Sequence, residues 1–111
     1  MIVIKSIRID EKLRDDIKIV FKNTVFNEII RKILHDNLVT DEKFEKSLND
    51  FYVIPRTKNK KYDYTVRLDD GIYEKVKEFI NRIYIRYSVK RNLSDIILFF
   101  FIKEINKEVH Q

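Results

Sequence analysis

Two arginines, Arg8 and Arg67, stand in the same five-residue pattern at two places in the chain. A hydroxyl residue lies two positions before each of them, Ser6 in one place and Thr65 in the other, with apolar residues in between. This alternation is typical of a strand that buries one face, so the arginine and the hydroxyl share the other face. A guanidinium group makes two parallel hydrogen bonds to a planar acceptor such as guanine O6 and N7. Ser6, Arg8, Thr65 and Arg67 are therefore the candidate base-reading residues; the alternative is that the two arginines are only the solvent-exposed side of an amphipathic strand.

The pattern around these arginines belongs to a longer internal repeat. Residues 6–13 align with residues 65–72 at a constant shift of 59 positions. Residues 27–30 align with residues 94–97 at a shift of 67, which indicates an eight-residue insertion in the second copy before its second helix. A repeat of this kind dictates the architecture, and here each copy is expected to be a short strand followed by two helices.

In the first copy, the strand is expected over residues 5–9. Asp10 follows it and is expected to cap a helix that runs to about Lys22. After a break, Thr24 is expected to cap a second helix that ends near Asn37.

In the second copy, the strand is expected over residues 65–68 and Asp69 is the helix cap. The first helix is longer and is expected to end near Tyr87. Asn92 and Asp95 have the spacing of a capping box, which predicts the start of the second helix.

The segment between the two copies is expected to hold a short helix from Thr40 to Tyr52, which Pro55 ends. The stretch that follows carries four positive charges and no negative ones, and it is expected to be an exposed linker that contacts DNA without sequence preference. Its basic residues are Arg56, Lys58, Lys60 and Lys61.

The start of each second helix is a candidate phosphate site. Unpaired backbone amides and the positive end of the helix dipole favour an anion there, and small polar and basic side chains gather at both starts. Ordinary helix capping is compatible with this interpretation. The candidate phosphate-binding residues are Lys22, Thr24, Asn27, Lys90, Arg91, Asn92 and Ser94.

No set of residues has the spacing of a catalytic or metal site. The two histidines, His35 and His110, lack a ligand-spaced neighbour, and the chain has no cysteine. Acidic pairs such as Asp15–Asp16 are adjacent in sequence and diverge on a helix. We expect no enzyme activity, no cofactor, no metal and no small-molecule substrate.

The composition is that of a folded chain, with 44% hydrophobic and 37% charged residues. A single glycine excludes a glycine-built phosphate cradle, and the net charge of +5 is compatible with a nucleic-acid partner. No apolar run approaches a membrane span or a signal peptide. We expect a cytoplasmic protein, and the isoleucine- and lysine-rich, cysteine-free composition would suit a thermophile.

Strand, helix and helix, with a polar-faced strand and small polar residues opening the second helix, resembles the ribbon-helix-helix DNA-binding family. The chain resembles its tandem form, known from a conjugation regulator and from regulators of archaeal viruses. The fold class is then mainly α with short β: a first unit over residues 1–38, a helical segment and basic linker over 39–62, and a second unit over 63–111. The resemblance implies a sequence-specific transcriptional regulator, a repressor, that places an antiparallel ribbon in the major groove of double-stranded DNA with Ser6, Arg8, Thr65 and Arg67 as its reading residues.

Several alternatives stay open at this point. The segment between the two strands is long enough for them to pair within one chain, and they could equally pair between two chains. The second unit, with its insertion, need not read DNA. The apolar run of the last helix predicts an oligomer interface, at least of a homodimer, formed by Phe99, Phe100, Phe101 and Ile102, unless the middle of the chain covers it. The rival function is a protein-interaction module on the same fold, such as an antitoxin or an inhibitor of a host complex. An RNA-binding role lacks the usual aromatic platform on a sheet.

Overall fold

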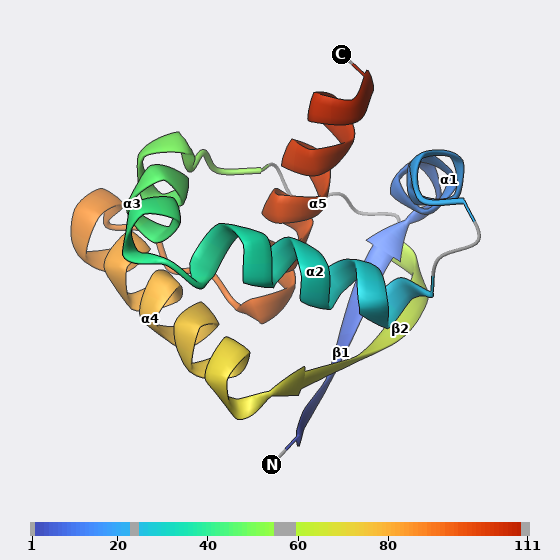
Figure 1. Ribbon diagram of the computed structural model, residues 1–111. Helices are drawn as coiled ribbons and strands as arrows, with labels where there is room; N and C mark the ends of the chain where they lie inside the picture. Colours follow the sequence, from blue (N-terminus) through green and yellow to red (C-terminus); the bar gives the residue numbers. More distant parts are fainter. Residues whose placement is uncertain (1, 23–24, 55–59, 110–111) are drawn as a thin grey trace.

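The computed structural model describes residues 2–22, 25–54 and 60–109, with residues 60, 61, 108 and 109 described through the backbone alone (Figure 1). Over these residues the fold is mainly helical, with one two-stranded antiparallel sheet. This confirms the predicted class of mainly α with short β. None of the helices found in these ranges is long and apolar enough to cross a lipid bilayer. The elements in chain order are β1 (Ile2–Asp10), α1 (Glu11–Val20), α2 (Phe26–Leu38), α3 (Asp41–Asp50), β2 (Lys60–Asp69), α4 (Asp70–Tyr87) and α5 (Leu93–Val109).

The two strands pair with each other within one chain, which resolves one alternative that the sequence left open. The register places Ser6 opposite Thr65, with Arg8 opposite Asp63 and Arg67 opposite Ile4. Both strands begin earlier than the sequence indicated, β1 at Ile2 and β2 at Lys60. The strand β2 begins at Lys60, so the expectation that Lys60 and Lys61 belong to a linker is wrong. Arg56 and Lys58 lie outside the described residues.

The inward face of this ribbon is apolar, as predicted. Ile7, Ile9, Val66 and Leu68 are buried, each exposing 2% of its surface or less. The alternate residues point away from the helices and are exposed. A two-stranded sheet is not stable alone, so the helices that cover Ile7, Ile9, Val66 and Leu68 are what hold the ribbon in place.

The helix starts follow the predicted caps where the structure describes them. Asp10 accepts a hydrogen bond from the Leu13 amide at 2.8 Å, and Asp69 accepts one from the Ile72 amide at 2.8 Å. The capping box is confirmed as well: Asn92 Oδ1 accepts from the Asp95 amide, and Asp95 accepts from the Asn92 amide.

The start of α2 differs from the prediction. The residue at its N-cap is Val25, which makes no side-chain cap. Thr24, the predicted cap, lies outside the described residues. The first turn is held by backbone bonds to the Val25 carbonyl, from Glu28 and Ile29.

Each copy of the repeat packs its helices on the other copy. Helix α2 contacts β2 and α4, whereas α5 contacts β1 and α1 (Figure 1). One hydrophobic cluster takes buried side chains from all seven elements. The segments 1–38 and 63–111 therefore share a single core, and neither copy buries its apolar face by itself.

The apolar run of α5 lies inside this core. Phe99, Phe100 and Phe101 each expose 1% of their surface, and Ile102 is half-buried. The expectation of an exposed interface is wrong for Phe99, Phe100 and Phe101, because aromatic rings of the same chain cover these three side chains. The contacts, by ring-centroid distance, are Phe101 with Phe26 (5.4 Å), Phe100 with Phe79 (5.4 Å), and Phe99 with Phe51 (5.0 Å) and Tyr52 (5.3 Å).

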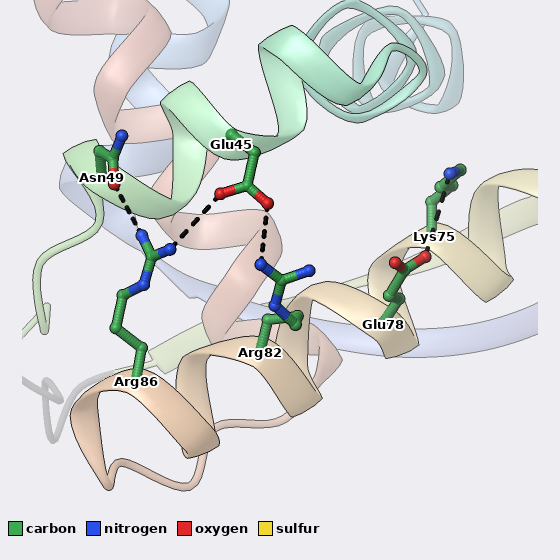
Figure 2. Close-up of polar contacts among 6 residues, drawn as sticks. All are labelled: Glu45, Asn49, Lys75, Glu78, Arg82 and Arg86. Atoms are coloured by element: carbon green, nitrogen blue, oxygen red, sulfur yellow. Dashed lines mark hydrogen bonds and ion pairs between the residues drawn. The ribbon is translucent and has the colours of Figure 1, made fainter.

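The helix α3, predicted between the copies, is fixed to α4 by a polar clamp (Figure 2). Glu45 accepts from the guanidinium groups of Arg82 at 2.8 Å and Arg86 at 3.4 Å, and Arg86 also donates to Asn49 at 2.7 Å. On the same helix, Leu48 is completely buried. The segment between the copies is therefore part of the packed structure up to this helix.

Candidate nucleic-acid interface

The outward face of the ribbon is centred on Ser6 and Thr65. The internal repeat aligns these two residues with each other, and the strand register places them directly opposite. The two copies of the repeat are therefore related by an approximate two-fold axis that passes through the centre of the ribbon, between Ser6 and Thr65. Arg8 and Arg67 occupy equivalent positions, two residues beyond the centre on opposite strands, and both are exposed.

The environments of the two arginines differ. Arg8 Nε donates to Asp63 Oδ1 at 2.8 Å, and both side chains are more than half exposed. This hydrogen bond, together with the negative charge of Asp63, raises the pKa of Arg8 above its ordinary value. Arg67 lies opposite Ile4 instead, and no carboxylate of the described residues forms an ion pair with it.

The residues Ile4 and Asp63 belong to the same outward face, and the sequence reasoning missed both. Their register partners, Arg67 and Arg8, were the predicted reading residues. The sequence does contain a signal for Asp63. Tyr62, Asp63 and Tyr64 continue the apolar–polar alternation of the strand that follows, which places Asp63 on its polar face. The signal for Ile4 was hidden, because residues 2–4 are all apolar and show no alternation.

Asn27 ties the start of α2 to the free edge of β2. Its Nδ2 donates to the Thr65 carbonyl at 3.1 Å, and its Oδ1 accepts from the Arg67 amide at 2.9 Å. An unpaired strand edge is thereby closed at the centre of the ribbon. The side-chain amide that was predicted to contact phosphate is engaged in this bond pair, so Asn27 acts here as a positioning residue.

The same bonds indicate which type of antiparallel pair the outward residues form. Because Thr65 and Arg67 turn these backbone groups toward Asn27, we infer that their pairs with Ser6 and Ile4 are of the non-hydrogen-bonded type. In such pairs the side chains approach more closely than in the alternate pairs. Arg8 and Asp63 lie two positions from Ser6 and Thr65, so their pair is of the same non-hydrogen-bonded type. The close approach in such a pair accounts for the short Arg8–Asp63 ion pair.

Three of the predicted phosphate-binding residues come together at the turn between α4 and α5. Lys90, Arg91 and Asn92 line an open depression of about 530 Å³ with Lys77 and Tyr84 among its other walls. The Lys77 ammonium pairs with Glu74 at 2.9 Å, a contact that raises the pKa of Lys77. Among the described residues this depression has an excess of positive charge, as a phosphate contact requires.

The other predicted phosphate-binding residues lie elsewhere. Lys22 follows α1 and is exposed, while Ser94 is half-buried in the first turn of α5. Thr24 is outside the described residues. In the described ranges no group of three or more histidine or acidic side chains is arranged to hold a metal ion.

Comparisons with protein-family models, with curated proteins and with solved structures find no match for this chain.

Proposed function

We propose that this chain is a sequence-specific regulator of transcription, acting as a repressor, that places the ribbon β1–β2 in the major groove of double-stranded DNA. In this proposal the chain is a tandem ribbon-helix-helix protein whose two units form one intertwined body. The observation that carries the proposal is the coincidence of repeat and register at Ser6 and Thr65. The ribbon is exposed, polar and approximately symmetric, so it matches the approximate two-fold symmetry of the major groove of a DNA duplex.

The dimensions and chemistry of the ribbon support this proposal. The major groove of B-DNA, about 12 Å wide, admits a two-stranded ribbon. Ser6 and Thr65 at the centre would donate to or accept from bases, and Arg8 and Arg67 would contact guanine on either side. The buried inward face, with Ile7 and Val66 held by helices, keeps the reading face rigid.

One chain supplies a complete ribbon, so a single site needs one chain only. A homodimer, which the sequence also predicted, would carry two ribbons and read two such sites. Its interface would have to use a surface other than Phe99, Phe100 and Phe101, because these side chains are buried within one chain.

The experiment that tests the proposal is selection of bound duplexes from a randomised pool at moderate salt. Recovery of one short motif would support a base-reading ribbon, and two copies at fixed spacing would indicate two ribbons per assembly. Binding without enrichment of any sequence would contradict sequence-specific regulation. An absence of binding at low salt would favour the rival role as a protein-interaction module.

A further inference from the structure

The two arms of the ribbon are equivalent in the repeat but not in chemistry. We define the Arg8 arm as Arg8 with Asp63, and the Arg67 arm as Arg67 with Ile4, each a directly opposed pair. The repeat relates Arg8 to Arg67 and Ile4 to Asp63. An acidic residue in one arm thus stands where the other arm has an aliphatic one.

In the Arg8 arm, the guanidinium is already engaged. Arg8 Nε donates to Asp63 at 2.8 Å on a surface where both side chains are accessible. The pair offers a base both donors, from the remaining guanidinium nitrogens, and an acceptor, from the carboxylate. An aspartate in the major groove accepts from the N4 amino group of cytosine, and its charge disfavours nearby phosphates.

In the Arg67 arm, the guanidinium has no acidic partner among the described residues. Its backbone amide is held by Asn27, which fixes the strand from which the side chain extends. Across from it, Ile4 leaves 61% of its surface in solvent on the same outward face. Exposed aliphatic carbon opposite a guanidinium that has no acidic partner among the described residues matches a thymine methyl beside a guanine.

We propose that the chain recognises a double-stranded DNA site whose two halves differ, with Ile4 and Asp63 as the residues that set the difference. The Arg67 arm reads a half containing guanine next to thymine. The Arg8 arm reads a half in which a cytosine amino group faces Asp63. This inference rests on the proposed function and specifies the class of its target: a site that fixes the orientation of one chain on the duplex.

The test compares consensus sequences selected by the wild type and by an arm-exchange variant. Asp63→Ile gives the Arg8 arm the composition of the Arg67 arm, and Asp63→Asn removes the charge with little change of shape. We expect a non-palindromic consensus for the wild type. With Asp63→Ile, the altered half should gain about a tenfold preference for the bases of the Arg67 half, which moves the consensus toward an inverted repeat.

The reverse exchange, Ile4→Asp, should shift the other half toward the bases of the Arg8 half. Thermal unfolding of each variant verifies that the fold is kept, and Asp63→Asn serves if Asp63→Ile does not fold. A palindromic consensus for the wild type, or an unchanged consensus for Asp63→Ile and Asp63→Asn, would overturn the inference while leaving the proposed function intact. A wild type that enriches no sequence would overturn both.

Discussion

Ser6 and Thr65 lie directly opposite each other in the ribbon, and they are also the same position of the internal repeat. An antiparallel pair of identical strands has its two-fold axis at the residue that faces its own equivalent. The approximate two-fold axis of the repeat therefore passes through a single pair of hydroxyl residues. Both strands belong to one chain, so this pairing is intramolecular.

Removal of the Asn27 side chain should weaken both the fold and DNA binding. Asn27→Ala removes the partner of the Thr65 carbonyl and of the Arg67 amide, both at the solvent-exposed surface. Each lost bond should lower the free energy of unfolding by about 0.5–1.5 kcal/mol. Urea denaturation measures this loss. Asn106→Ala, at an exposed position of α5, is the matched control and should leave the stability unchanged; an equal effect of both substitutions would contradict the positioning role of Asn27.

Truncation of a buried α5 aromatic should act on stability and not on assembly. Phe100 is 1% exposed, so Phe100→Ala should lower the free energy of unfolding by about 3–5 kcal/mol. Calorimetry measures the shift in Tm. In size-exclusion chromatography, the folded variant should elute at the volume of the wild type. A changed oligomeric state with an unchanged Tm would instead indicate that Phe100 belongs to an oligomer interface.

The α3 clamp should contribute much less to stability than the buried Leu48 of the same helix. Glu45, Arg82 and Arg86 are all more than a third exposed, and exposed ion pairs contribute about 0–1 kcal/mol. Leu48→Ala creates a cavity at a fully buried site and should cost about 2–5 kcal/mol. Denaturation of Glu45→Ala and Leu48→Ala compares the two; a larger loss for Glu45→Ala would show that the clamp dominates.

The depression at the α4–α5 turn should supply affinity without sequence preference. The double substitution Lys90→Ala/Arg91→Ala should weaken binding to all duplexes evenly and reduce the slope of log affinity against log salt by about 1.8. Titrations at several salt concentrations measure this slope. The pair Lys43→Ala/Lys46→Ala on α3 removes the same charge from another surface, and an equal reduction there would contradict a local phosphate contact.

The sequence was sufficient to predict features that local chemistry controls. Asp10, Asp69 and the Asn92–Asp95 pair cap helices as their types and spacing indicated. The burial of Ile7 and Val66 followed from alternation alone. These predictions succeed because each depends on residues within one turn or one strand.

Features that depend on distant residues could not be predicted. The bonds of Asn27 join residues 38 and 40 positions apart, and no local pattern announces them. The apolar run at Phe99 to Phe101 is the same in sequence whether a partner chain or the chain itself covers it. Its coverage by Phe26, across the fold, emerges only once the helices of each copy pack on the other.

The most direct test of the ribbon as a reading surface is the affinity of Arg8→Ala/Arg67→Ala for the selected duplex and for a scrambled duplex of the same composition. Both are measured by fluorescence anisotropy at one salt concentration. We expect the preference for the selected duplex to fall by about a hundredfold. The control Arg31→Ala/Lys32→Ala, which removes two exposed cations from α2, should retain the preference. If the ribbon variant keeps the wild-type preference with its fold intact, the ribbon does not read the sequence.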